Sequence, residues 1–181
     1  PKMTVARALF IRLMRQYTEL SYSLTQLEIQ KLAYFMQEAG EPLRLQYKAG
    51  PYGPYAENLN KVLEMLEGHF IIGYNGSRDP HVELKLMPGA VEEAEAFLAH
   101  YPDCRARLQR AAEVIEGFET PYGMELLSSI HWVARHAEPP ARSPEEAIAA
   151  VYAWNDRKRT LFKEEHLRVA WERLDGCGWL N

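Results

Sequence analysis

Cysteine is scarce in this sequence, and the two that are present form neither a redox motif nor a metal-binding motif. Cys104 and Cys177 stand far apart, and no CxxC spacing occurs among the 181 residues. Clustered cysteines are typical of structural zinc sites and of disulfide-stabilised secreted domains. Their absence argues against a zinc site and favours a reducing compartment, so we expect a cytoplasmic protein without a metal.

Long hydrophobic runs are missing as well. No apolar run approaches the roughly 18 residues that a membrane-spanning helix needs. Arg7, Arg12 and Arg15 interrupt the hydrophobic stretch near the N-terminus, so the pattern of a signal peptide is not met. We therefore expect no membrane association. Because the chain opens on Pro1 rather than on Met, we also expect it to be a fragment of a longer protein.

The common enzyme signatures do not occur either. There is no HExxH motif, and His131 and His136 are five residues apart, on different faces of a helix. Gly50 and Gly53 are followed by prolines rather than by the lysine of a phosphate-binding loop, and the Rossmann glycine pattern is absent. Residues 128–129 are serines in mid-helix without the turn of a nucleophile elbow. We expect no catalytic residue, no cofactor and no metal ligand here.

What the sequence does have is the composition of a folded domain. Apolar residues make up 47% of the chain and the net charge is −4, so a sizeable core is expected. The length suits one domain, 1–181. We predict an α+β fold that is predominantly α-helical, with about seven helices and a small antiparallel sheet. Helical spacing or start signals occur at 4–20, 23–39, 54–67, 90–99, 103–118, 121–136, 143 onward and 161–174, and strand patterns at 45–48, 70–72 and 82–86. The candidate residues that cap the start of a helix are Thr4, Asp103, Thr120 and Ser143. On the wheel of the helix 54–67, Asn60 falls on the exposed side.

The most constrained backbone is the double Gly-Pro turn at 50–55. Each proline fixes φ and disfavours helix in the residue before it. Pro54 suits the first position of a helix, with Gly53 as a permissive cap. We therefore predict that Gly50, Gly53 and Pro54 form a structural motif that opens the helix 54–67. Tyr52 and Tyr55 lie in this turn and fit either the walls of a pocket or simple packing.

Glu28 and Lys31 stand one turn apart on the helix that begins near Ser23, where Gln26 has capping-box spacing. Glu28 falls inside the apolar arc of the helical wheel and Lys31 lies at its rim. Charged groups in such places need partners. A semi-buried structural pair and a catalytic pair are both compatible with the pattern, and the structural pair is the interpretation that we favour.

Charge is unevenly distributed. Residues 54–99 hold eight acidic residues against Lys61, Arg78 and Lys85, whereas both ends of the chain are basic, with residues 157–159 reading Arg-Lys-Arg. Solvated surface explains most asymmetries of this kind. An alternative is a nucleic-acid-binding domain of winged-helix type, in which the 70–72/82–86 hairpin is the wing. The acidic side chains on the same segment oppose that alternative, because they would face phosphates.

Several segments, taken in order, resemble the C-terminal domain of the antitoxin DarG, and GPYGP-type elements also occur in Panacea-type antitoxin domains. The matching segments are QKLAYFMQEAGEPL, YKAGPYGPYAENL, LEGHFIIGY, PYGMELLSSIHWVA, WNDRKRTLF and AWERL. The resemblance implies a single antitoxin domain that binds the DNA ADP-ribosyltransferase toxin DarT by mimicking single-stranded DNA. DarG proteins also carry a macrodomain that removes ADP-ribose from DNA. No part of this sequence resembles one, so we expect the fragment not to be an enzyme.

Mimicry of this kind would set carboxylates in the place of phosphates and aromatic rings in the place of bases. Direct binding of nucleic acid is then not expected, and the oligomeric state is left open. The candidate residues for contact with the toxin are Tyr52, Tyr55, Glu57, Glu64, Glu67, Glu92, Glu93 and Glu95.

Overall fold

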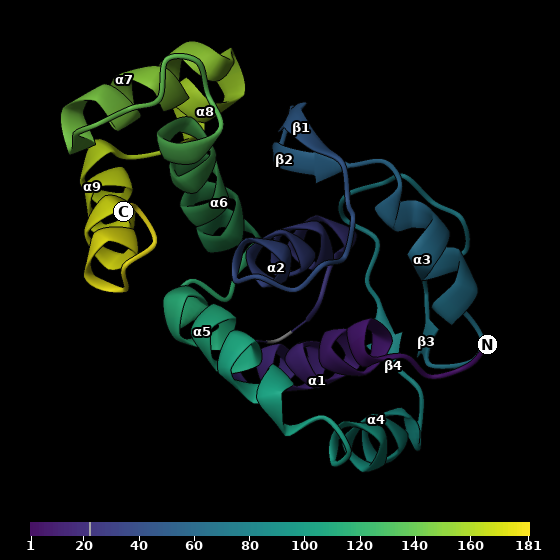
Figure 1. Ribbon diagram of the computed structural model, residues 1–181. Coiled ribbons are helices and arrows are strands. Elements are labelled where there is room, and N and C mark those ends of the chain that lie inside the picture. The colour runs from purple at the N-terminus through teal and green to yellow at the C-terminus, as the bar shows by residue number, and fades with distance from the viewer. Residues whose placement is uncertain (22) are drawn as a thin grey trace.

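Two N-terminal helices lie at the centre of the molecule, which we describe from a computed structural model covering residues 1–21 and 23–181 (Figure 1). Helix α1 (Val5–Leu20) begins as predicted, since the Thr4 side chain accepts a hydrogen bond from the Arg7 amide. Helix α2 (Gln26–Glu38) is buried continuously from Gln26 to Met36. Its cap is Thr25 and not Ser23 as predicted, because Thr25 and Glu28 complete a reciprocal capping box.

The predicted helix 54–67 is wrong in its first part. Strand β1 (Tyr47–Gly50) turns through residues 51–52 into strand β2 (Gly53–Ala56), and helix α3 (Leu59–Leu66) starts only afterwards. Pro54 therefore lies in a strand rather than at the first position of a helix. Gly53 does need a glycine, but because its φ is +106° and not because it caps a helix.

The second strand pair forms the hairpin that the sequence predicts. Strands β3 (Ile71–Ile72) and β4 (Lys85–Leu86) pair antiparallel, with Ile71 opposite Leu86. Each is only two residues long, so the winged-helix-like element is much smaller than the sequence indicated. Asn60, which the helical wheel placed on the exposed side of its helix, is buried and bonds Gln26 and Tyr74.

The second half of the chain is helical. Helix α4 (Ala90–Leu98) is followed by the 3₁₀ helix η1 (Pro102–Cys104), so α5 (Arg105–Ile115) is not capped by Asp103. Thr120 caps α6 (Pro121–Arg135) and Ser143 caps α7 (Pro144–Trp154), as predicted. The final helix predicted at 161–174 is present as α9 (Glu164–Gly176), and the short helix α8 (Asp156–Leu161), which was not predicted, precedes it. The described residues form nine α-helices instead of about seven.

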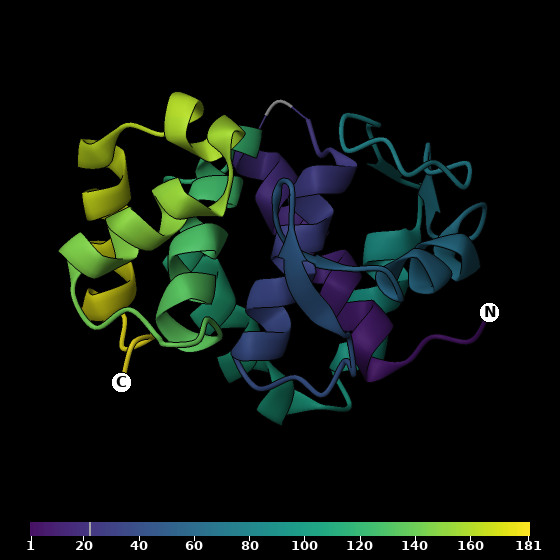
Figure 2. The same cartoon turned by 90° about the horizontal axis from the view of Figure 1, so that it is seen from above.

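The helices pack around α1 and α2 in two groups. Helix α1 packs against α4 and α5, whereas α2 packs against α6, and α6 in turn contacts α7 and α9. In Figures 1 and 2 the C-terminal helices α6–α9 accordingly form one side of the molecule, with α2 and the β1–β2 hairpin next to them. The α+β class with predominant helix is confirmed.

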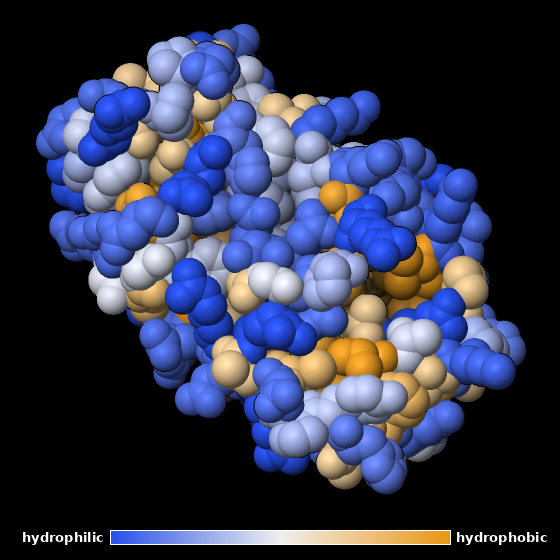
Figure 3. All heavy atoms as spheres, viewed as in Figure 1, coloured by the Kyte–Doolittle hydropathy of each residue, from blue (hydrophilic) through white to orange (hydrophobic). Residues whose placement is uncertain are grey.

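The surface in the view of Figure 3 is mostly hydrophilic, and apolar side chains show mainly toward the side of α3 and α4. None of the helices in the described part of the chain has both the length and the apolarity that crossing a membrane requires.

Candidate functional site

The β1–β2 hairpin is held from both sides by buried and half-buried side chains. From α2, the Gln30 side-chain amide bonds both the N–H and the C=O of Ala56, each at 2.9 Å. Lys31 Nζ donates to the Pro54 carbonyl oxygen at 2.9 Å. From the C-terminal helices, Trp154 Nε1 donates to the Gly50 carbonyl oxygen at 3.0 Å. The hairpin is thereby fixed between the two groups of helices.

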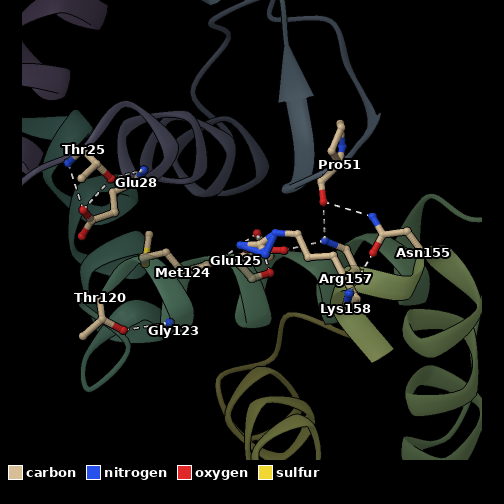
Figure 4. Close-up of polar contacts among 11 residues, drawn as sticks. Thr25, Glu28, Pro51, Thr120, Gly123, Met124, Glu125, Asn155, Arg157 and Lys158 are labelled. Atoms are coloured by element: carbon tan, nitrogen blue, oxygen red, sulfur yellow. Dashed lines mark hydrogen bonds and ion pairs between the residues drawn. The ribbon is translucent and has the colours of Figure 1, made fainter. Parts of the chain in front are cut away.

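A buried ion-pair cluster supports the tip from below (Figure 4). Glu125 of α6 accepts hydrogen bonds from Lys158 Nζ at 2.7 Å and from the Arg157 guanidinium at 2.8 Å. Lys158 Nζ also lies 3.3 Å from the Pro51 carbonyl oxygen and 4.6 Å from the centre of the Trp154 ring. Burial lowers the pKa of Lys158, while the neighbouring Glu125 carboxylate opposes that shift. This cluster couples the hairpin to α6 and α8.

Lys31 and Glu28 do not pair with each other, which corrects the predicted Glu–Lys pair. Glu28 accepts hydrogen bonds from the Tyr17 hydroxyl and from Thr25, and burial raises its pKa to about 7. Lys31 points the other way, to the hairpin, and burial lowers its pKa to about 7. Both residues are buried and hydrogen-bonded, and each has its own partners because α2 is buried continuously from Gln26 to Met36. Their structural role stays a prediction.

A cavity of about 210 Å³ opens beside the hairpin. Its lining is mostly apolar and aromatic, with a few polar groups, and comprises Gln26, Leu27, Gln30, Lys31, Pro51, Tyr52, Tyr55, Arg78 and Pro80. The Arg157 guanidinium lies 4.6 Å from the centre of the Tyr52 ring. Gln26 Oε1 is buried without a hydrogen-bond partner among the described residues. Such a cavity can accept a flat ring together with a hydrogen-bond donor.

An exposed ion pair stands at the rim of this cavity. Glu57 directly follows β2 and lies 2.9 Å from an Arg78 guanidinium nitrogen. The Tyr55 hydroxyl donates to Glu57 at 3.0 Å and accepts from Asn60 at 2.8 Å. The Tyr55 hydroxyl is the main cause that lowers the pKa of Glu57, followed by Arg78. Carboxylate and ring are thus held in a fixed relation to each other.

The eight candidate contact residues fall into separate places. Tyr52, Tyr55 and Glu57 come together at the hairpin, and Glu64 is exposed on the neighbouring α3. Glu67 faces inward instead, where its carboxylate accepts hydrogen bonds from the amides of Gly73 and Tyr74.

The acidic run on α4 lies elsewhere. Glu92 and Glu93 are exposed in the first turn of α4, and Glu95 pairs with Arg12 of α1 at 3.2 Å. Figure 1 shows α4 on the far side of α1 from the hairpin. The eight residues therefore do not form one continuous surface.

Sequence reasoning missed the buried cluster. Residues 157–159 were interpreted as a basic surface end, yet Lys158 is fully buried, because Glu125 and the Pro51 carbonyl lie next to it. The available signal was Glu125 itself, an acid within the apolar pattern of the helix 121–136. Arg78, which closes the cavity rim, carried no local signal at all.

Two comparisons with known proteins bear on this site. No family model matches the chain. It is 47% identical over 174 residues, or 96% of its length, to the DNA ADP-ribosyl glycohydrolase of Thermus aquaticus. It is 34% identical over 188 residues, again 96% of its length, to proteins of the same name from Mycobacterium bovis and Mycobacterium tuberculosis. The chain covers 47% and 53% of these relatives, respectively, and so spans about half their length.

These relationships support the resemblance to DarG in a coarser form, in that homologues of the chain bear the name DNA ADP-ribosyl glycohydrolase. They also contradict the expectation that the chain is not an enzyme, since the proteins that match 96% of its length are named glycohydrolases. The assignment to a C-terminal toxin-binding domain stays a prediction.

Proposed function

We propose that this chain is part of a DNA ADP-ribosyl glycohydrolase of the DarG type and that it binds the DNA ADP-ribosyltransferase toxin DarT. The similarity along nearly the whole chain to proteins named for the glycohydrolase supports the first part. The second part rests on the resemblance to the toxin-binding domain of DarG and on the hairpin site. A protein with both properties would counteract the toxin in two ways. It would block the DNA-binding site of the toxin, and it would remove the ADP-ribose that the toxin has added to DNA.

The observation that carries the binding proposal is the grouping of Tyr52, Tyr55 and Glu57 on one firmly held hairpin. A cleft that binds single-stranded DNA offers cations for phosphates and flat surfaces for bases. The hairpin presents rings beside a carboxylate, which is the matching arrangement. Because Gln30 and Lys31 fix the hairpin from below, little conformational entropy is lost when a partner docks on it.

The remaining candidates have unequal parts in this proposal. Burial raises the pKa of the Tyr74 hydroxyl, and the Glu64 and Glu57 carboxylates both add to that shift, so the exposed Glu64 lies on the same side of the molecule as Glu57. Glu92, Glu93 and Glu95 on α4 contribute long-range attraction at most, which salt screens over about 10 Å at 0.1 M. Glu67 holds the loop after α3 in place.

Calorimetry with an inactive DarT-type toxin tests the binding proposal. We expect Glu57→Lys to weaken binding by about tenfold or more, because the variant replaces an attraction between opposite charges at the interface with a repulsion. Glu92→Lys makes the same change of charge on α4 and serves as the matched control, with an expected effect below about threefold. Equal effects of the two variants would show that net charge, and not the hairpin, determines binding.

The glycohydrolase proposal is tested separately, by measuring release of ADP-ribose from an ADP-ribosylated oligonucleotide against a mock preparation. Release by this chain would assign the activity to these 181 residues. If the chain binds the toxin without releasing ADP-ribose, the activity belongs to the half of the relatives that it does not cover.

A further inference from the structure

Three side chains with metal-ligating atoms meet where the C-terminal ends of α2 and α6 lie together. They are Glu38 of α2, His131 of α6 and His136, the residue that ends α6. Their ligand atoms all lie within 4.8 Å of one another. His136 Nε2 is 2.5 Å from Glu38 Oε1, and His131 Nδ1 is 3.9 Å from the same oxygen. Nothing in the sequence pointed to this group, because two histidines five residues apart do not share a helix face.

The distances suit an ion between the three atoms. Zinc binds imidazole nitrogen at about 2.0–2.1 Å and carboxylate oxygen at about 2.0–2.2 Å, so two ligands of a tetrahedral ion are about 3.3 Å apart. The separations of 2.5 and 3.9 Å lie on either side of that value. Small side-chain rotations of Glu38 and His136, neither of which is fully buried, are enough to equalise them.

The His131 ring is buried, and the Tyr34 hydroxyl lies 2.6 Å from Nδ1, the nitrogen that would bind the ion. The unprotonated nitrogen of an imidazole has a single lone pair. The hydrogen bond from Tyr34 therefore has to open when an ion binds, which leaves the Tyr34 oxygen next to the ion.

Solvent reaches the group from one side. The exposed fraction of the side chain is 37% for His136 and 22% for Glu38, whereas it is 3% for His131. An ion can therefore enter, and a water molecule or the Tyr34 hydroxyl can complete four-fold coordination. Two imidazoles and one carboxylate are a donor set that zinc accepts readily.

We propose that Glu38 Oε1, His131 Nδ1 and His136 Nε2 bind one Zn²⁺ ion. The ion would link the end of α2 to the end of α6. These two helices also carry Lys31 and Glu125, which hold the hairpin, so the metal would stabilise the relative position of the two groups of helices. The site is distinct from the hairpin cavity and does not depend on the proposed function.

Zinc titration of the full chain without a histidine tag, after treatment with a chelator, tests this. Calorimetry is expected to give saturable binding at one ion per chain, and Zn²⁺ to raise the melting temperature, because a ligand that binds only the folded state stabilises it. Co²⁺ in place of Zn²⁺ is expected to give the visible absorption of a tetrahedral site. The ring of His136 stacks on Trp132 at 4.8 Å, so Co²⁺ should also quench tryptophan fluorescence.

Glu38→Gln and His136→Gln are the informative variants, since both residues are partly exposed and their replacement leaves the buried His131 in place. Each is expected to weaken Zn²⁺ binding by about tenfold or more. His166→Gln is the matched control, because it removes another histidine that has a partner, Tyr122 at 2.8 Å, outside the site. The absence of one-to-one binding, or affinities in both variants equal to that of the unmodified chain, would overturn the proposal.

Discussion

Two ion pairs next to the β1–β2 hairpin contain similar groups but lie in opposite environments. The Glu125 and Lys158 side chains are 1% and 0% exposed, whereas Glu57 and Arg78 are 61% and 49% exposed. A buried pair loses its hydration, so that each charge depends on the other. An exposed pair exchanges easily with water and contributes little to stability. The Glu125–Lys158 pair therefore holds the hairpin in place, whereas the Glu57–Arg78 pair is accessible to a binding partner.

Removal of one charge from the buried pair is expected to have the largest effect. Glu125→Ala leaves Lys158 buried without its counter-charge, which should lower the free energy of unfolding by about 3–5 kcal/mol. Unfolding in urea measures this loss of free energy. The double variant Glu125→Leu with Lys158→Met removes both charges and should recover most of that loss. If the double variant is as unstable as Glu125→Ala, packing rather than charge explains the effect.

The turn of the hairpin is expected to be the next most sensitive point. Gly53 has a φ of +106°, and an added Cβ atom would lie 3.1 Å from Ser129 Oγ. Gly53→Ala should destabilise the protein by about 1–3 kcal/mol, through backbone strain together with the close contact to Ser129. Gly76→Ala is the control, because Gly76 also has a positive φ but nothing lies within 4 Å of its added Cβ. Equal losses of melting temperature at the two positions would mean that the contact with Ser129 is unimportant.

The two separate charges on α2 should give stability two opposite dependences on pH. Burial raises the pKa of Glu28 from 4.5 to about 7, so the folded state binds more protons than the unfolded state in this range and stability falls as pH rises through it. Burial lowers the pKa of Lys31 from 10.5 to about 7, so the unfolded state binds more protons there and stability rises with pH above 7.

The contributions of Glu28 and Lys31 are separated by measuring the free energy of unfolding at a series of pH values, with one variant for each residue. Glu28→Gln should flatten the acidic limb and Lys31→Met the alkaline limb. A profile that neither variant alters would mean that both groups keep their ordinary pKa values in the folded protein.

The exposed pair should show the smallest effect on stability. Glu57→Ala is expected to change the free energy of unfolding by less than about 1 kcal/mol, because its partner Arg78 remains solvated. The same variant should weaken toxin binding measurably in calorimetry. A large loss of stability would place Glu57 with Glu125 as a structural residue and remove the contrast between the pairs.

Sequence patterns correctly predicted those helices whose starts are determined by residues close to them in the sequence. The caps Thr4, Thr120 and Ser143 are formed by residues a few positions away, and the helices that follow them were predicted correctly. Strand β2 was missed because Gln30 and Lys31, far away in the sequence, bond its backbone. Buried polar residues were the second failure, since a helical wheel cannot tell that Asn60 faces Gln26 and Tyr74.

The candidate site was predictable in the same uneven way. Tyr52, Tyr55 and Glu57 could be grouped from the sequence because only five positions separate the first from the last, so that they need no long-range contact to lie near one another. The proposed metal-ligand group could not be predicted, because about half of the chain separates Glu38 from His131 and His136 and only the packing of α2 on α6 brings them together. Local chemistry is visible in the sequence, whereas chemistry assembled by packing is not.

Competition between this chain and DNA for the toxin tests the central claim most directly. A labelled single-stranded oligonucleotide bound to an inactive DarT-type toxin is titrated with the chain, and its fluorescence anisotropy is followed. We predict that the chain displaces the oligonucleotide, that Glu57→Lys displaces it less well than Glu92→Lys, and that the chain alone does not bind the oligonucleotide. Tight binding of the oligonucleotide to the chain itself, or toxin binding without displacement, would contradict the account.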